Sequence, residues 1–307
     1  MKLLLTGDWH LRFKKPKLRN DDYFESQSNK IKQILEIAKK EKCDYIIQPG
    51  DFFDSMHVPL FVIQYYIKLF KEYDIPILCV RGQHDLRYHS DNVGNTPIAV
   101  MEASEVLTTI PNCGMLIGTK DNIVIYGCSF NEEIPKIISG NVNEGFNILV
   151  VHKMIVEEKI WQSQEDFIYG NHMFRKFNFD LFACGDNHNG FILDNGNGRF
   201  LVNCGSLMRS TIDQANHEPF ICVYTPGEKA ISKKILTVKN DVFDVKAAEE
   251  YKKRNEEFEL FADVLKEKKV RGLNFLDNIK KSLDDEVDDD VRSIVFEALN
   301  YTKDKEQ

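Results

Sequence analysis

Short apolar runs that end in the same few kinds of polar side chain constrain the fold of this chain more than any other feature. They are KLLLTGDWH (2–10), CDYIIQPGD (43–51), IPILCVRGQHD (75–85), FNILVVH (146–152) and FDLFACGDNH (179–188). Continuous apolar runs of this length are typical of strands buried on both faces. The sequence therefore predicts five buried strands with aspartate, histidine or amide side chains at their carboxyl ends.

Helical patterns alternate with the first of these strands. Apolar residues such as Ile31, Ile34 and Leu35 recur at helical spacing within 22–41, and a second apolar helix is expected near 59–72. The order β-α-β-α-β predicts a largely parallel sheet with helices outside it. Further strands are expected as a hairpin in 115–130, with its turn at Asp121 and Asn122, and in 198–206, 220–227 and 234–238.

Composition limits the class of protein. Of the 307 residues, 43% are hydrophobic and 29% are charged, which is ordinary for a soluble globular chain. No run of 18 apolar residues occurs, so no membrane span is expected. The seven scattered cysteines contain no CxxC pair, which predicts reduced thiols and a cytoplasmic protein. A net charge of −8 argues against a broadly basic nucleic-acid-binding surface but leaves local phosphate contacts open.

A change of composition near residue 240 indicates a domain boundary. We expect a main domain at 1–240 and a small, mostly helical region at 241–307. In this second region the sequence is densely charged, and apolar residues recur at helical spacing. Two interpretations of this tail remain open. Its helices either pack on the main domain or form a docking pair for a partner protein.

The polar strand ends predict a site for two metal ions. Carboxyl ends of strands in an α/β sheet open into one crevice, and mixed carboxylate, imidazole and amide ligands suit a pair of divalent cations. Each motif alone has an ordinary structural explanation as a turn, a helix cap or a core histidine. Five such motifs in this order, each at a strand end, are hard to attribute to ordinary structural roles alone. We assign Asp8, His10 and His188 to one metal, Asp51 as the bridge, and Gln83, His152 and Asp186 to the other. His84 is left free of metal, and Asp85 is placed to orient its ring.

In this order the motifs resemble those of the calcineurin-like metallophosphoesterases. More narrowly they are similar to the SbcD and meiotic-recombination-eleven nucleases and their short phage relatives, with NCGSLMRST (203–211) as a further match. The resemblance covers about 1–210. It implies an α/β fold of two sheets in a sandwich flanked by helices, two divalent metal ions, most simply Mn²⁺ with Mg²⁺ as the alternative, and cleavage of DNA phosphodiesters. It also implies a homodimer and an SbcC-like coiled-coil ATPase partner.

Two positions depart from the family pattern. Gln83 stands where the family has asparagine, which moves the amide oxygen one methylene further out, and Asp186 stands where the family has histidine. An aspartate adds negative charge and favours harder cations such as manganese or magnesium. We expect His84 to stabilise the developing charge or to protonate the leaving oxygen.

Other residues are candidates for contact with the substrate. Lys14, Lys15 and Lys17 follow His10 directly and are expected beside the crevice, where they would contact DNA phosphates; Ser206 and Arg209 would line the substrate side. Trp9 is expected to pack rather than to stack on bases. Two alternative functions remain: a phosphoesterase that acts on a non-DNA substrate, and a catalytically degenerate scaffold subunit.

Overall fold

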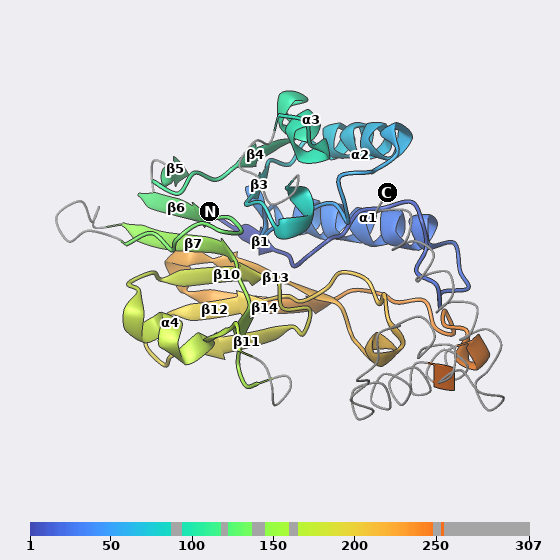
Figure 1. Ribbon diagram of the computed structural model, residues 1–307. Helices are drawn as coiled ribbons and strands as arrows, with labels where there is room; N and C mark the ends of the chain where they lie inside the picture. Colours follow the sequence, from blue (N-terminus) through green and yellow to red (C-terminus); the bar gives the residue numbers. More distant parts are fainter. Residues whose placement is uncertain (87–93, 118–121, 137–144, 160–164, 248–252, 255–307) are drawn as a thin grey trace, which may run out of the picture. The chain divides into compact units, whose positions relative to one another are not determined.

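The computed structural model of the chain describes residues 1–86, 94–117, 122–136, 145–159, 165–247 and 253–254. The chain forms two compact units, Met1–Val242 and Phe243–Gln307. The fold described below is that of the first unit (Figure 1). In the second unit a helical turn at 245–247 is described, and the other helices predicted for the tail lie outside the described residues.

The first sheet has six strands in the order β14-β13-β1-β2-β3-β4. Its strands are β1 (Leu3–Leu5), β2 (Tyr45–Gln48), β3 (Ile77–Cys79), β4 (Leu107–Thr109), β13 (Phe220–Thr225) and β14 (Ala230–Ile235). Strands β1 to β4 run parallel, while β13 pairs antiparallel with β1 and with β14. Leu4 at the centre of β1 lies opposite Ile46 on one side and Val223 on the other.

The second sheet also has six strands, in the order β11-β12-β10-β7-β6-β5. Its strands are β5 (Met115–Ile117), β6 (Ile123–Cys128), β7 (Phe146–His152), β10 (Leu181–Gly185), β11 (Phe191–Asp194) and β12 (Phe200–Asn203). The four central strands are parallel, and the edge strands β5 and β11 are antiparallel to their neighbours. A separate pair joins β8 (Ile155–Val156) to β9 (Ile168–Tyr169).

Local signals in the sequence set the ends of the helices. The Asp22 carboxylate accepts a hydrogen bond from the backbone N–H of Glu25 and so caps α1, which ends at Lys42 in the left-handed conformation. Pro59 precedes α2, and the Thr96 side chain caps α3. The helices are α1 (Tyr23–Glu41), α2 (Leu60–Tyr73), α3 (Pro97–Ala103) and α4 (Gly170–Lys176). Short 3₁₀ turns are η1 (Gln83–Asp85), η2 (Ile212–Gln214) and η3 (Pro226–Glu228).

Alternation along each strand decides which layer of the core a side chain joins. Leu3 and Leu5 pack between the two sheets with Val150 of β7. Leu4, between them in sequence, faces the other way and packs with the apolar faces of α1, α2 and α3. Leu149 packs on the outer face of the second sheet with Met173 of α4. The unit is therefore a sandwich of two sheets with helices on both outer faces, which confirms the fold class (Figure 1).

The β-α-β-α-β segment forms the parallel strands β1, β2 and β3 of the first sheet, as expected. One expectation about the strands needs correction. The last strand is Ala230–Ile235 rather than 234–238, since the η3 turn and Lys229 in the left-handed conformation return the chain to β13 at once. The hairpin expected in 115–130 is confirmed by the antiparallel pair β5 and β6.

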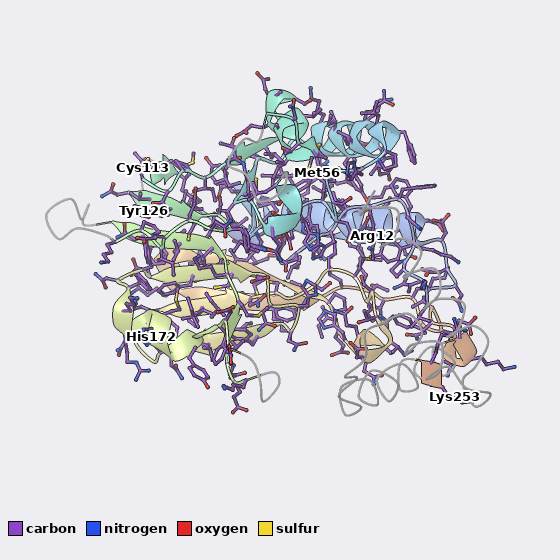
Figure 2. All side chains as sticks on the ribbon, in the orientation of Figure 1. Arg12, Met56, Cys113, Tyr126, His172 and Lys253 are labelled. Atoms are coloured by element: carbon purple, nitrogen blue, oxygen red, sulfur yellow. The ribbon has the colours of Figure 1, made fainter. Side chains whose placement is uncertain are left out.

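Most of the thiols lie inside the protein, as expected from the apolar runs that contain them. All seven cysteines are free, and six of them are buried; Cys113, labelled in Figure 2, is exposed. Within the described ranges, no helix combines the length and the apolar character that a membrane crossing needs.

Candidate active site

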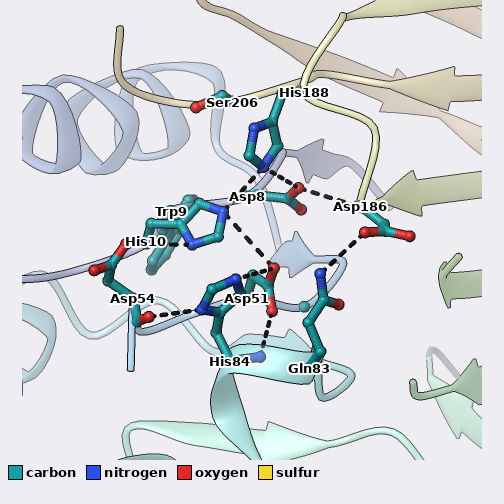
Figure 3. A network of polar contacts seen from close by, with 12 residues as sticks. Asp8, Trp9, His10, Asp51, Asp54, Gln83, His84, Asp186, His188 and Ser206 are labelled. Atoms are coloured by element: carbon teal, nitrogen blue, oxygen red, sulfur yellow. Dashed lines mark hydrogen bonds and ion pairs between the residues drawn. The ribbon is translucent and has the colours of Figure 1, made fainter. Parts of the chain in front are cut away.

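Polar side chains gather where strands of both sheets come to an end (Figure 3). Each of them closes its strand or follows it within a few residues. They are Asp8 and His10 after β1, Asp51 after β2, Gln83 after β3, His152 at the end of β7, and Asp186 and His188 after β10. The structure thus brings together the seven residues that the sequence predicted as ligands, and it draws them from two sheets rather than from one.

Asp8, His10 and His188 form one side of this cluster. The Nε2 atoms of His10 and His188 lie 3.1 Å apart, and His188 Nε2 lies 3.7 Å from Asp8 Oδ2. One donor atom of each residue lies within 4.8 Å of the others. Two ring nitrogens and a carboxylate oxygen at this spacing could hold one divalent cation.

Gln83, His152 and Asp186 form the other side. Gln83 Oε1 lies 2.7 Å from His152 Nε2, and the Gln83 amide nitrogen donates to Asp186 Oδ1 at 3.1 Å. The other ring nitrogen of His152 lies 2.7 Å from the Pro49 carbonyl oxygen, which fixes the ring. The longer glutamine side chain therefore still places its amide oxygen beside the histidine.

Asp51 stands between the two sides. Its Oδ1 accepts a hydrogen bond from the backbone N–H of His84 at 3.0 Å. Its Oδ2 lies 3.7 Å from His10 Nε2 and 3.5 Å from His152 Nε2. One oxygen of a single carboxylate thus faces a donor nitrogen from each side, which is the placement that a bridging ligand requires.

Glycines precede these ligands because the site leaves no room for a side chain there. A Cβ at Gly50 would lie 2.3 Å from His152 Nδ1, and one at Gly82 would lie 2.0 Å from Asp51 Oδ1. Gly50 also has φ = +106°, which is accessible mainly to glycine. The glycine of each Gly-Asp or Gly-Gln pair is therefore required because the backbone packs closely against the site.

Three of the ligand candidates themselves have left-handed backbones. The φ angles are +45° at His10, +50° at Asp51 and +79° at Asp186. Aspartate and histidine tolerate this region better than most residues, and such conformations concentrate at functional sites. Each of these residues turns the chain sharply at the end of its strand, which aims its side chain into the cluster.

The carboxylates make the centre of the cluster strongly favourable for positive charge. Burial lowers the pKa of His152, but Asp51, Asp8 and Asp186 outweigh it and raise that pKa to about 10. Nearer the other side, burial lowers the pKa of His10 to about 3, which leaves its ring neutral and able to ligate. In the absence of metal, the field of the carboxylates thus holds a proton on His152.

The donor set fits divalent cations. Among the described residues, Asp8 Oδ1 and Asp51 Oδ2 are buried carboxylate oxygens of the cluster without a hydrogen-bond partner. Buried polar atoms are rarely left unpaired, because their desolvation is costly. Unpaired carboxylate oxygens beside the ring nitrogens of His10, His152 and His188 suit cations of the manganese, iron or zinc type.

His84 and Asp85 occupy different environments. The ring of His84 is 43% exposed, its Nδ1 lies 2.7 Å from the Asp54 carbonyl oxygen, and its Nε2 lies 4.0 Å from Asp51 Oδ2. The Asp85 carboxylate instead accepts backbone hydrogen bonds from Gly82, Phe52 and Phe53. Asp54 therefore orients the His84 ring, whereas Asp85 holds the loops that carry His84 and Asp51.

The predicted substrate contacts lie at two places. Lys14, Lys15 and Lys17 are exposed, and the first two line a cavity of about 290 Å³ together with Arg12 and Asp54. The cavity adjoins the polar cluster through Asp54, whose Oδ1 lies 3.8 Å from His10 Nδ1.

Ser206 and Arg209 lie in the segment that follows β12. Both are buried, and the Ser206 hydroxyl donates to the Met208 carbonyl at 2.8 Å. The Arg209 guanidinium donates to the carbonyls of Ala215 and Lys239. Ser206 is joined to the cluster by a backbone bridge to Asp8.

Sequence reasoning missed the part that Asp54 plays. Its backbone carbonyl lies against His84, and its carboxylate accepts a hydrogen bond from Arg12 at 2.9 Å. The sequence feature that could have indicated this role is the second aspartate of GDFFD (50–54), three residues after Asp51. Trp9, by contrast, behaves as expected: it is fully buried and packs on Phe52 at 4.8 Å between ring centroids.

A carboxylate–imidazole cluster at the strand ends of a two-sheet sandwich is suited to metal-assisted hydrolysis. The comparison with family models makes this specific. The chain belongs to the calcineurin-like phosphoesterase family, whose model matches residues 1–277. It is therefore a metal-dependent phosphoesterase.

Individual relatives are distant. The chain is 21% identical over 336 residues to the double-strand break repair protein MRE11 of Encephalitozoon cuniculi, a match that covers 92% of this chain and 54% of that protein. The chain thus spans about half the length of that relative. A solved dimetal phosphatase from Danio rerio is 10% identical, with a TM-score of 0.48, and the match covers 78% of this chain and 97% of that one. A second solved structure is 14% identical at the same TM-score of 0.48 and covers 77% and 99%.

Proposed function

We propose that this phosphoesterase hydrolyses DNA phosphodiester bonds with two divalent cations, as a short, phage-type nuclease of the SbcD and meiotic-recombination-eleven kind. The observation that carries the proposal is the cluster in which one oxygen of Asp51 faces donor nitrogens of His10 and His152 at 3.7 and 3.5 Å. Similarity to the MRE11 repair protein supports DNA as the substrate.

The two sides of the cluster would each hold one cation. We propose Asp8, His10 and His188 for the first, Gln83, His152 and Asp186 for the second, and Asp51 as the bridge. The mixture of imidazole and carboxylate donors favours Mn²⁺, with Mg²⁺ as the alternative. The carboxylates that hold a proton on His152 are the groups that would neutralise the charge of the cations.

When bound, the cations supply Lewis acidity that activates a water and neutralises the phosphate. The side chains around them position the reacting groups. Because the Asp54 carbonyl can only accept, Nδ1 of His84 carries the proton of that hydrogen bond, and Nε2 is directed to the crevice near Asp51. In its protonated form His84 can donate from Nε2 to the leaving oxygen of the ester.

A cleavage assay tests the proposal. The full-length chain with MnCl₂ is incubated with single-stranded DNA, double-stranded DNA and bis(p-nitrophenyl) phosphate. We expect all three to be hydrolysed and EDTA to abolish the activity. Hydrolysis of the nitrophenyl ester without DNA cleavage would instead favour a phosphoesterase for another substrate. No turnover with any divalent metal would favour a degenerate scaffold.

Neutralising the exposed lysines is expected to reduce the salt dependence of DNA binding. If Lys14, Lys15 and Lys17 each contact a phosphate, the triple glutamine variant should flatten the slope of log affinity against log salt by about 2–3 for duplex DNA. Fluorescence anisotropy at several salt concentrations measures this slope. A matched control replaces the exposed Lys39, Lys40 and Lys42 at the end of α1. Equal slopes for the two variants would exclude this contact.

Partners are proposed from the resemblance and the relative. We propose a cytoplasmic homodimer in which region 241–307 docks on an SbcC-like coiled-coil ATPase. Deleting 270–307 should then abolish co-purification with the ATPase while Mn²⁺-dependent hydrolysis of bis(p-nitrophenyl) phosphate persists. Retained co-purification would assign the tail to packing on the main domain instead.

A further inference from the structure

A second cavity lies apart from the metal cluster, between α1 and the segments that follow β12 and β14. It has a volume of about 360 Å³, within the usual range of small-ligand pockets. Its lining includes four cationic side chains and one carboxylate: Arg19, Lys30, Arg209, Lys239 and Glu25. Arg19 is paired with the Asp21 carboxylate through two hydrogen bonds of 2.7 Å, so Lys30, Arg209 and Lys239 supply the excess positive charge that suits the cavity to an anion.

Lys30 is the most unusual member of this lining. It is only 6% exposed, and its Nζ has no hydrogen-bond partner among the residues that the structure describes. A buried ammonium group without a partner is costly, so its position calls for a counter-charge. Glu25, the carboxylate in the lining, stands on an exposed position of α1, and no ion pair joins it to Lys30 in the described part of the chain.

The surroundings of Lys30 disfavour its charged form unless an anion lies beside it. Burial, together with the positive charges of Arg209 and Arg19, lowers the pKa of Lys30 to about 7. The Arg19 guanidinium donates to the Arg209 carbonyl, and Arg209 donates in turn to the carbonyls of Ala215 and Lys239. These bonds hold the cations in place around the cavity without neutralising Lys30.

Neutral donors complete the lining. The side-chain oxygen of Gln33, Oε1, accepts a hydrogen bond from the backbone N–H of Thr237 at 2.9 Å. The side-chain NH₂ group of Gln33 is therefore the group left to donate to a ligand. Asn29 lies one turn earlier on the same helix and also lines the cavity. Charged donors combined with amide donors are the usual means of binding phosphate oxygens.

We propose that this cavity binds a phosphate group, distinct from the one that is cleaved, through Lys30, Arg209 and Lys239. The phosphate is either one of the backbone groups of a bound nucleic-acid strand or a free phosphate compound. The site is joined to the metal cluster by a short segment, because Arg209 follows Ser206 by three residues and Ser206 bridges to Asp8. The proposal does not depend on DNA being the substrate.

Calorimetric titration of the full-length chain with inorganic phosphate tests the site. EDTA is present so that phosphate bound to metal does not contribute. The unaltered chain should bind phosphate, and Lys30→Met should weaken binding by about tenfold or more, as expected for losing a hydrogen bond to a charged group. Lys32→Met, on the same helix but outside the lining, is the matched control and should bind normally.

Stability provides an independent measurement on the same variants. Without phosphate, Lys30→Met should be more resistant to urea than the unaltered chain, because it removes a buried, unpaired amine. With phosphate, the unaltered chain should gain resistance and the variant should not. If Lys30→Met does not fold, Lys239→Met serves instead, since Lys239 is exposed and its carbonyl contact with Arg209 survives the change.

A fluorescent 5′-phosphorylated oligonucleotide in EDTA distinguishes the two sources of phosphate. If the strand backbone enters the cavity, Lys30→Met weakens oligonucleotide binding and lowers the salt slope by about 0.7, and inorganic phosphate competes. If a free phosphate compound is the ligand, oligonucleotide binding is unchanged while the calorimetric loss remains. Phosphate binding that is absent from the unaltered chain, or equally strong in Lys30→Met, would overturn the proposal.

Discussion

Replacing Asp51 by asparagine is expected to lower kcat/KM for every phosphodiester substrate by about three orders of magnitude or more. The Asp51 carboxylate is fully buried, and its Oδ2 lies between His10 and His152 without a hydrogen-bond partner among the described residues. An amide at this place removes the negative charge, and one of its two ends carries N–H groups that cannot ligate. We expect the occupancy of the two cation sites to fall and the spacing of the cations to change.

The measurement combines initial rates with metal content after dialysis against MnCl₂. Asparagine is well suited to the left-handed backbone at Asp51, where φ is +50°, so the change should leave the local fold intact. Asp74→Asn is the matched control. Asp74 has φ = +53°, is exposed and ends α2 just before β3, whereas the cluster lies beyond the other end of that strand. A folded Asp51→Asn variant with two bound metals and normal turnover would contradict the bridging assignment.

His84→Ala is expected to lower DNA cleavage by about 10²- to 10⁴-fold while leaving the metal content unchanged. The imidazole is held by the Asp54 carbonyl at 2.7 Å and presents Nε2 to the crevice. The effect should depend on the leaving group. An alkoxide leaving from DNA needs a proton, whereas nitrophenolate does not, so hydrolysis of bis(p-nitrophenyl) phosphate should fall much less.

This dependence separates acid catalysis from two other roles of His84. One ring nitrogen of His84 also lies within 4.8 Å of donor atoms of His10 and Asp51, which is close enough for a shared cation. Loss of metal in His84→Ala would make it a ligand, and equal loss of activity on both substrates would make it a positioning residue. His172→Ala is the matched control, since His172, labelled in Figure 2, is exposed on α4, which packs on the outer face of the second sheet.

Much of the site could be predicted from the sequence because its donors are attached to short apolar strands. Asp8, Asp51 and Gln83 each follow a buried run and a glycine, and that pattern is local. The glycines themselves reflect the site, since a Cβ at Gly82 would meet the Asp51 carboxylate. Residue type and order along the chain were therefore sufficient to collect the candidates.

The roles of neighbouring residues could not be predicted in the same way. Asp85 follows His84 in sequence, yet its carboxylate holds the backbone of Phe52 and Phe53, and the His84 ring is oriented by Asp54 instead. The direction in which a side chain points after a strand depends on the turn that carries it, here the 3₁₀ turn η1. That turn is stabilised by contacts with a segment about thirty residues away, which no local pattern records.

Lys30 illustrates the same limit on a larger scale. In sequence it is one lysine among several on an amphipathic helix, where such residues are usually solvated. In the structure it lies against a cavity that residues 208–209 and 237–239 help to line, and its amine is buried. Burial is a property of the whole packing, so the charge of the cavity emerges only from the tertiary structure.

Residue types and their order along the chain were enough to identify the buried strands and the carboxylates, imidazoles and amide that follow them. Only the packed fold shows that the donors come from two sheets, that His10 lies against His188 across 178 residues, and that a second, cationic cavity exists. The physical reason is that ligand type belongs to single residues, whereas distance, burial and electric field arise only when segments far apart in the chain pack together.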